Sequence, residues 1–277
     1  MTIANALTID VEDYFQVSAF AIARDQWDRF PCRVERNVDA ILALLADKNA
    51  HATFFTLGWI GEHYPEVVRR IARGGHEIAS HGYMHERASD LSPDEFREDV
   101  IRAKSLLEDL SGAEVKGYRA PSFSIGPRNW WALDVLHEAR YRYSSSIYPI
   151  RHDHYGVPDA PRFAYRPSEK HDLVELPITT VAAIGRNWPA GGGGYFRLFP
   201  YALSRSLLRR VNERDGQACI FYFHPWELDP EQPRQNGISF KTRFRHYLNL
   251  RRTETRLRRL LADFEWDRVD RIFLQAT

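Results

Sequence analysis

Cysteine is scarce in this sequence, because only Cys32 and Cys219 occur among 277 residues and no CxxC pair is present. Two cysteines this far apart provide neither a disulfide framework nor a cysteine-rich zinc site. Thiols without partners are typical of proteins kept in a reducing compartment. The cysteine content therefore indicates a reduced, cytoplasmic protein that folds around an apolar core.

An excess of charge of one sign is also missing. The 38 Lys and Arg residues balance 37 Asp and Glu residues, for a formal net charge of +1, which removes the global electrostatic argument for nucleic-acid binding. No run approaches the ~20 apolar residues of a membrane span. The first residues lack the basic and apolar regions of a signal peptide. We therefore expect a cytoplasmic protein without a nucleic-acid partner.

What the sequence does contain is an alternation of strand-like and helix-like segments. Apolar, β-branched or aromatic runs predict short strands of the kind buried in parallel sheets, at 6–11, 51–57, 76–80, 115–119, 141–147, 173–178 and 218–223. Apolar residues at helical spacing predict helices at 37–48, 65–73, 93–110, 129–139 and 201–214. The alternation indicates an α/β protein, and seven strands fit a closed or nearly closed β/α barrel better than an open sheet.

Two segments interrupt this alternation. Four consecutive glycines at 191–194 predict either a close backbone approach or a flexible connection. Residues 241–260 hold eight Lys or Arg and one Glu, with Leu and Tyr interleaved, which predicts a basic helix packed on the barrel. Its cationic face is either solvated or a site for an anionic ligand or membrane surface. We expect the barrel to span 1–228 and a C-terminal helical extension to span 229–277.

Acidic side chains follow the first predicted strand. In a β/α barrel the catalytic residues lie at the C-terminal ends of the strands. The first strand ends with Asp10, Glu12 and Asp13, and carboxylates this close are costly unless a cation or hydrogen-bond donors compensate them. Taken alone, the cluster is more typical of a strand that leaves the core beside helix-capping acids.

Three further strand ends supply complementary groups. The third strand is followed by His81 and His85, which on a helical turn would share one face and could hold one metal ion, although an HxxxH pair alone is a weak signal. The fourth ends at Arg119, which can hold a carboxylate. The seventh is followed by His224, which can move protons near neutral pH. Taken alone, Arg119 is more typical of a surface or core-edge arginine and His224 of a core histidine. Together the four segments predict metal-assisted acyl hydrolysis.

In this order the four segments resemble the motifs of the polysaccharide deacetylase family, carbohydrate esterase family four. They read TIDVED at 8–13, SHGYMH at 80–85, RAPSF at 119–123 and IFYFH at 220–224. The resemblance implies a distorted (β/α)7 barrel. Other segments, such as GGGYFR and FHPWELDP, resemble a narrower branch associated with exopolysaccharide and exosortase loci, whose C-terminal extension of unknown function would correspond to 229–277.

The resemblance also implies catalytic roles for the matched residues. Asp10 corresponds to the catalytic base, Arg119 to the residue that orients this base, and His224 to the general acid. One departure from the family is Ser144, where related chains often have aspartate, and this change would alter a contact near the substrate. Glu175 lies in a strand-end segment near the substrate, with no role assigned.

A divalent metal is the cofactor that the resemblance implies, with Zn²⁺ as the expected ion. His81 and His85 correspond to two of its ligands, and the third is Glu12 or Asp13. We favour Glu12, because Asp10 and Glu12 are two residues apart and therefore point to the same face of a strand. Asp13 stays as the alternative ligand.

The expected activity is the hydrolytic removal of N-acetyl groups from an N-acetylated oligo- or polysaccharide, a bacterial exopolysaccharide or its precursor, with release of acetate. Two alternatives are an allantoinase-like amide hydrolase on the same barrel and a non-catalytic carbohydrate-binding barrel. The saccharide-branch segments favour sugars over the first, and the joint presence of base, ligands and acid favours an enzyme over the second. A glycosidase would need paired carboxylates but no HxxxH. A lipid-linked glycan at the inner membrane face would suit the basic segment.

Overall fold

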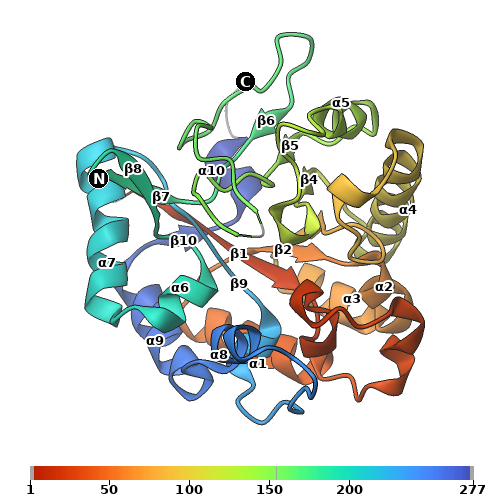
Figure 1. Ribbon diagram of the computed structural model, residues 1–277, viewed down its shortest axis with the longest axis horizontal. Coiled ribbons are helices and arrows are strands. Elements are labelled where there is room, and N and C mark those ends of the chain that lie inside the picture. Colours follow the sequence, from red (N-terminus) through yellow and green to blue (C-terminus); the bar gives the residue numbers. More distant parts are fainter. Residues whose placement is uncertain (1–2, 154, 275–277) are drawn as a thin grey trace.

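Strand β1 (Asn5–Val11) is the centre of a curled parallel sheet in the computed structural model, which describes residues 3–153 and 155–274. It is buried along its whole length and pairs with three strands, β2 (Thr53–Thr56), β9 (Ile220–Phe223) and β10 (Trp266–Asp267). Beyond β2 the sheet continues through β3 (Glu77–Ser80), β4 (Gly117–Tyr118), β5 (Tyr143–Ser144) and β6 (Val174–Glu175) (Figure 1). All seven predicted strands are confirmed, six of them with shorter bounds and β1 with one more residue.

The two ends of this sheet nearly meet, so the sheet forms a distorted barrel. After β6 the backbone continues across the gap, and the N–H of Thr179 donates to the carbonyl of Ile220 on β9 at 3.4 Å. From the other side, the N–H of Tyr222 donates to the carbonyl of Gly191 at 2.7 Å. The expected distorted (β/α)7 barrel is therefore confirmed. Its parallel strands place all their C-terminal ends at one mouth.

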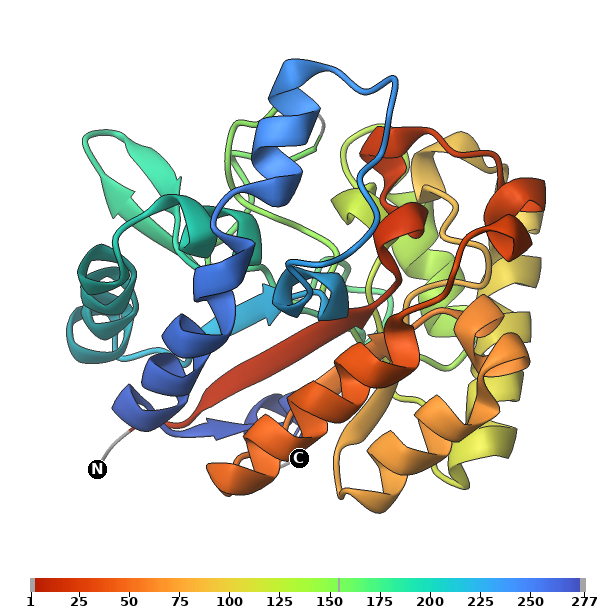
Figure 2. The same ribbon diagram turned by 90° about the horizontal axis from the view of Figure 1, so that it is seen from below.

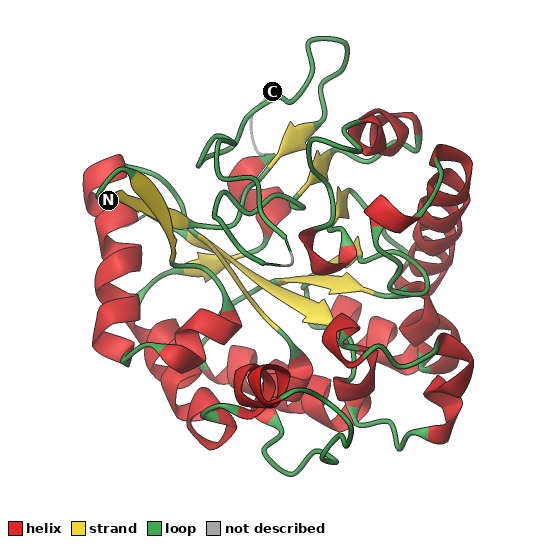
Figure 3. Cartoon of the chain, in the orientation of Figure 1, coloured by secondary structure: helices red, strands yellow, loops and turns green. Residues whose placement is uncertain are grey.

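Helices form a layer outside the sheet, as Figure 3 shows. Helix α4 (Pro93–Ser111) begins where the sequence predicts, because Ser92 and Glu95 form a capping box. The Ser92 hydroxyl accepts the N–H of Glu95, and the Glu95 carboxylate accepts the N–H of Ser92 at 2.8 Å. It ends at Gly112, which has a φ of 68°. The outer helices before β9 are α1 (Val34–Asp47), α2 (Gly58–His63), α3 (Pro65–Arg73), α4 (Pro93–Ser111), α5 (Trp131–Glu138), α6 (Gly193–Leu198) and α7 (Tyr201–Arg210).

The basic C-terminal segment forms two helices, so the single helix predicted over 241–260 is wrong. Helix α8 (Phe240–Tyr247) and helix α9 (Leu250–Asp263) are separated by Asn249, whose φ of 55° lies in the left-handed region and breaks a continuous helix. Helix α9 buries Leu257 and Leu260. Strand β10 then pairs with β1, and α10 (Val269–Phe273) follows it. Residues beyond 228 therefore contribute a strand to the sheet as well as helices.

The glycine run at 191–194 is a place of close backbone approach. A Cβ atom on Gly191 would lie 2.3 Å from the carbonyl oxygen of Ile220, and α6 begins within the run, at Gly193. An antiparallel hairpin that the sequence did not predict, β7 (Thr180–Ala183) and β8 (Arg186–Pro189), precedes this run. No helix among the described residues is both long and apolar enough to cross a bilayer.

Phe54 of β2 offers a test of the core, because its side chain is 0% exposed and lies in the larger of the apolar clusters. We expect Phe54→Ala to lower the free energy of unfolding by about 3–5 kcal/mol, through lost burial and the cavity left behind. Ile184 is 92% exposed at the turn of the β7–β8 hairpin, and Ile184→Ala should change it by less than about 0.5 kcal/mol. Urea unfolding measures both, and equal losses would contradict this core.

Candidate active site

Glu12, His81 and His85 converge at the mouth of the barrel. One ligand atom from each lies within 4.8 Å of those of the others, and all three residues are buried. Glu12 follows β1 and the histidines follow β3, so parallel strands bring together residues some 70 positions apart. Oε2 of Glu12 lies 2.8 Å from Nε2 of His85, and the two imidazole rings are 5.2 Å apart. One carboxylate and two imidazoles are a common ligand set for zinc.

The two imidazoles converge on an irregular turn, so the helical turn expected for His81–His85 is wrong. Gly82 has a φ of 76° and His85 a φ of 54°, and these left-handed residues fold the chain back toward the site. The carboxylate of Asp99 on α4 accepts the N–H of Tyr83 at 3.0 Å and fixes the turn. A Cβ atom on residue 82 would lie 3.0 Å from that carboxylate, so glycine suits this position in both conformation and space.

The donor atoms of this cluster fit a divalent cation. Nδ1 of His81 donates to the carbonyl oxygen of Arg119 at 2.8 Å, which leaves Nε2 of this ring with its lone pair. Burial lowers the pKa of His81 to about 4, so the ring is neutral at pH 7, as a metal ligand must be. Oε2 of Glu12 is buried, and Nε2 of His85 lies 2.8 Å from it. The cluster therefore joins a carboxylate oxygen to imidazole nitrogens, the donor atoms that a divalent cation takes.

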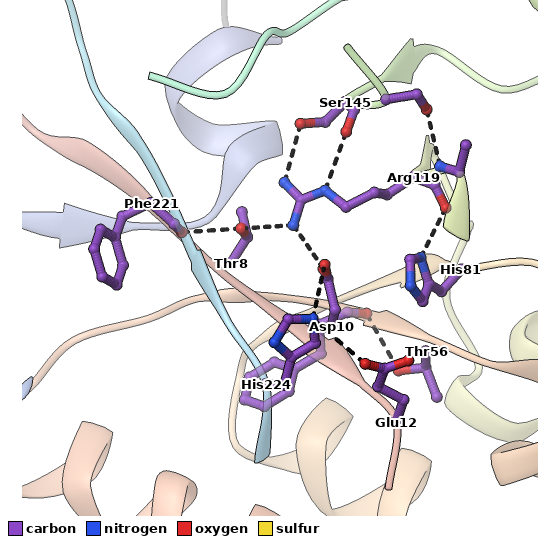
Figure 4. A network of polar contacts seen from close by, with 12 residues as sticks. Thr8, Asp10, Glu12, Thr56, His81, Arg119, Ser145, Phe221 and His224 are labelled. Atoms are coloured by element: carbon purple, nitrogen blue, oxygen red, sulfur yellow. Dashed lines mark hydrogen bonds and ion pairs between the residues drawn. The ribbon is translucent and has the colours of Figure 1, made fainter. Parts of the chain in front are cut away.

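Asp10 lies beside this cluster and is held by Arg119. Nη1 of Arg119 donates to Oδ1 of Asp10 at 2.6 Å and to Oγ1 of Thr8 at 2.9 Å. The other guanidinium N–H groups donate to the carbonyl and hydroxyl oxygens of Ser145 at 3.1 and 3.0 Å (Figure 4). Oδ2 of Asp10 faces Nε2 of His224 at 4.0 Å. One oxygen of the aspartate is therefore fixed while the other faces the site.

Glu175, to which the sequence assigned no role, fixes the loop whose Ser145 accepts hydrogen bonds from Arg119. Its Oε1 accepts the N–H groups of Ser146 and Ile147, each at 2.9 Å, and so fixes the loop that carries Ser145. Burial raises the pKa of Glu175 to about 7. Ser144 donates to the hydroxyl of Ser146 at 2.8 Å, which places it in the same hydrogen-bonded loop, outside the Glu12–His81–His85 cluster.

His224 faces the same site from the end of β9, as Figure 4 shows. Its Nε2 lies 3.4 Å from Oε1 of Glu12, and its Nδ1 bonds to Oε1 of Glu227 at 2.8 Å. Burial lowers the pKa of His224, but the hydrogen bond to Glu227 and the charges of Glu12 and Asp10 outweigh burial and raise the pKa to about 9. The ring also stacks on Trp226, with centroids 5.0 Å apart. A protonated imidazole therefore faces the carboxylates.

Of the four candidate metal ligands, Asp13 is the one that the structure leaves outside the Glu12–His81–His85 cluster. Its carboxylate accepts the N–H groups of Tyr14 at 2.7 Å, of Val34 at 2.9 Å, and of Arg33. It thereby caps the turn after β1 and the start of α1. Burial raises the pKa of Asp13 despite these hydrogen bonds. Between the two candidates for the third ligand, the structure brings Glu12 to the histidine pair.

Three residues of the site escaped the sequence analysis. Glu227 accepts from both the ring and the backbone N–H of His224, and Arg197 donates from Nε to Oε2 of Glu227 at 2.6 Å. Trp226 stacks on His224 and donates from Nε1 to Oε1 of Glu12 at 3.3 Å. A signal for Glu227 was present, because His224, Pro225 and Glu227 have the spacing of a capping box. No sequence pattern links Arg197 to this turn.

The site opens into a cavity of about 590 Å³, which Asp10, Glu12, His81, His85 and His224 all line. A second cavity of about 390 Å³ adjoins it and shares Val17, Ser18, His85 and Arg87 with the first. Aromatic rings form much of the wall of the larger cavity; they belong to Phe20, Phe123, Tyr155, Tyr195, Tyr222, Trp226 and Phe244. An elongated ligand could therefore extend to both sides of His85.

Two protein-family models match successive parts of the chain. Residues 25–143 match the model described as polysaccharide deacetylase, and residues 145–274 match a domain of unknown function. A peptidoglycan-N-acetylglucosamine deacetylase of Bacillus cereus is 40% identical over 81 residues, which are 29% of this chain and 30% of that protein. A chitooligosaccharide deacetylase of Azorhizobium caulinodans is 28% identical over 114 residues, 34% of this chain and 54% of that protein. The matches thus span about half or less of these relatives.

Solved structures share the whole fold. A Mycobacterium smegmatis protein provisionally named a polysaccharide deacetylase superposes with a TM-score of 0.64 and 24% identity, over 98% of this chain and 88% of that one. The peptidoglycan deacetylase PdaC from Bacillus subtilis superposes with a TM-score of 0.52 and 15% identity, over 98% and 90% of the two chains. Residues 25–143 therefore match the polysaccharide deacetylase family, and the solved structures share the barrel fold of the whole chain.

Proposed function

We propose that this chain is a metal-dependent N-deacetylase that releases acetate from N-acetylated amino sugars of an oligo- or polysaccharide. One observation carries the proposal. A carboxylate–imidazole cluster, an aspartate held by a buried arginine and a histidine held by a glutamate all line one cavity. These are the ligands, base and acid that the hydrolysis of an amide requires.

Glu12, His81 and His85 would hold the divalent ion, and we propose Zn²⁺ from the mixed oxygen and nitrogen donors. When bound, the ion supplies Lewis acidity toward the amide carbonyl and lowers the pKa of water. Asp10 takes the proton from the attacking water. Arg119 fixes the direction of the Asp10 carboxylate, because it bonds only to Oδ1. Oδ2 is then the oxygen that receives the proton.

His224 delivers the proton that the departing amine needs. An amine anion is a poor leaving group, so the C–N bond breaks readily only when the nitrogen is protonated. Nε2 of His224 faces the site while Nδ1 is bound by Glu227. Water adds its oxygen to the acetyl carbon, one proton passes to Asp10 and the nitrogen takes a proton from His224. The products are acetate and a free amino sugar.

The shape of the cavities supports a saccharide as substrate. Two adjoining cavities of about 590 and 390 Å³ exceed what a small cyclic amide needs, which counts against an allantoinase-like activity. A non-catalytic binding barrel would have no use for a base and an acid that line one site. We assign the glycan to an exopolysaccharide or its precursor, on the segments that resemble that branch.

The position of α8 supports a glycan that is held near a lipid surface. This helix stands out from the barrel (Figure 2), and Phe244 and Arg245 on it line the larger cavity. Phe240 and Phe244 are 83% and 49% exposed, beside Lys241 and Arg243. An exposed aromatic and cationic helix suits contact with the anionic or lipid part of a lipid-linked glycan.

Removal of a ligand should remove the metal and the activity together. We expect His81→Ala, His85→Ala and Glu12→Gln each to lower the bound metal from about one ion per chain to near zero, because three donors are needed to hold a zinc ion firmly. Metal analysis of the purified variants together with an acetate assay checks this. His63→Ala, a histidine outside the site, is the control. Asp13→Asn should keep its metal, and its loss there would contradict the choice of Glu12.

His224→Ala should keep the metal and lose turnover. We expect kcat to fall by ~10²- to 10⁴-fold, the range typical of a removed general acid, while the metal content stays at that of the wild type. Loss of the metal in this variant would instead place His224 among the ligands. Because Trp226 loses its stacking partner, circular dichroism should accompany the assay to confirm that the barrel is intact.

A substrate panel tests the activity and its alternatives. Acetate release should occur with N-acetylhexosamine oligomers and increase from the monomer to oligomers long enough to occupy both cavities. It should stop with a chelator and return with Zn²⁺. Turnover of allantoin but not of the oligomers would establish the amide-hydrolase alternative. Binding of oligomers without acetate release, in protein loaded with metal, would establish a binding barrel.

A further inference from the structure

The carboxylate of Glu227 holds His224 by two hydrogen bonds. Oε1 of Glu227 bonds to Nδ1 of His224 at 2.8 Å and accepts the backbone N–H of the same residue at 3.0 Å. Glu227 is 0% exposed, so its charge interacts with the imidazole without screening by water. The arrangement fixes both the position of the ring and the nitrogen that carries the proton, because a carboxylate can only accept. Nε2 is thereby the nitrogen that faces the site.

Arg197 on α6 holds this carboxylate from the other side. Its Nε donates to Oε2 of Glu227 at 2.6 Å, and its Nη1 donates to the carbonyl oxygens of His246 and Leu248 at 2.8 and 2.9 Å. Arg197 is 2% exposed. Burial raises the pKa of Glu227, but the charges of Arg197 and His224 outweigh it and lower the pKa to about 2. Glu227 is therefore ionised, and its second oxygen is occupied by the arginine.

The glycine run makes room for this ion pair. A Cβ atom on Gly193 would lie 2.3 Å from Oε1 and 2.6 Å from Oε2 of Glu227, whereas one on Gly194 would have no atom within 4 Å. The carboxylate thus packs directly against the backbone of residue 193. Any larger residue there must displace the carboxylate or the start of α6. The contact with Glu227 explains why residue 193 is glycine, although from the sequence alone the glycine run could be a flexible connection.

We propose that Glu227 and Arg197 are positioning residues that set the orientation of the general acid His224, and that holding this acid in place is one function of the segment 145–274. This inference rests on the proposed deacetylase function. Arg197, His224 and Glu227 all lie in the half of the chain matched only to a domain of unknown function. The histidine ligands and Arg119 lie in the other half. Asp10 and Glu12 precede both matched ranges, so three stretches of the chain assemble the active site.

Glu227→Gln tests the proposal, because glutamine keeps the size of the side chain and removes its charge. We expect kcat for acetate release to fall by about 10- to 100-fold, with KM within about twofold of wild type and the metal content unchanged. Glu227→Asp keeps the charge and should recover part of the lost kcat. Glu254→Gln removes an exposed carboxylate paired with Arg258 on α9 and serves as the matched control with wild-type kcat.

A double variant separates positioning from a general loss of stability. In the His224→Ala background, Glu227→Gln should cause no further fall in kcat, because the group on which it acts is gone. If Glu227→Gln alone does not fold, since it leaves Arg197 buried without its counter-charge, Glu227→Gln combined with Arg197→Gln removes both charges and replaces it. Wild-type kcat in the folded variant, or a full additional loss in the His224→Ala background, overturns the proposal.

The ring of His224 reports on the same contact without any turnover. In wild-type protein, ¹H–¹⁵N long-range NMR should show a proton on Nδ1 of His224, assigned by its absence in His224→Ala. This signal should shift in Gly193→Ala and stay in place in Gly194→Ala. An Nδ1 without a proton in the wild type contradicts the inference. Absence of acetate release from metal-loaded wild type contradicts the proposed function instead, so the two failures are distinguishable.

Discussion

The hydrogen bond between Arg119 and Asp10 is the interaction on which the rest of the site depends. The arginine is completely buried and lies 4.0 Å over the ring of Phe55, so its charge is compensated only by what the protein provides. It contacts side chains or backbone from β1 and from the loop after β5. A buried ion pair is a poor way to stabilise a fold, because apolar residues of the same volume often serve as well. The ion pair is better explained by its effect on Asp10, because Arg119 holds this carboxylate in one orientation.

The barrel gives each half of the site its own support. Asp10 and Glu12 follow β1, which pairs with β2 on the side of the histidine ligands and with β9 on the side of His224. The central strand therefore carries the carboxylates that both sides need. Trp226 connects the two sides, because it stacks on His224 and donates to Glu12. Displacement of β9 relative to β1 would separate His224 from the cluster.

The sequence predicted the strands and most of the site for the same physical reason. A buried parallel strand must be apolar along its length, so the polar residues that end it are conspicuous. The alternation of side chains favoured Glu12 over Asp13 as the third ligand, and Glu12 is the residue that lies beside the histidines. The sequence could not predict β10, a two-residue strand, nor the break at Asn249, because a left-handed residue leaves no apolar period to read. The His81–His85 turn was misread since four-residue spacing suits both a helix and a tight loop.

Glu227 and Arg197 were missed because a buried ion pair depends on contacts that are distant in sequence, 30 residues apart here. In the structure, Glu227 and Arg197 help to explain why two buried histidines of one site differ in pKa. His81 donates from Nδ1 to a neutral carbonyl oxygen, and its pKa falls to about 4. His224 bonds from Nδ1 to a carboxylate, and its pKa rises to about 9. Burial lowers the pKa of both rings, but at His224 the hydrogen bond to Glu227 and the charges of Glu12 and Asp10 outweigh burial.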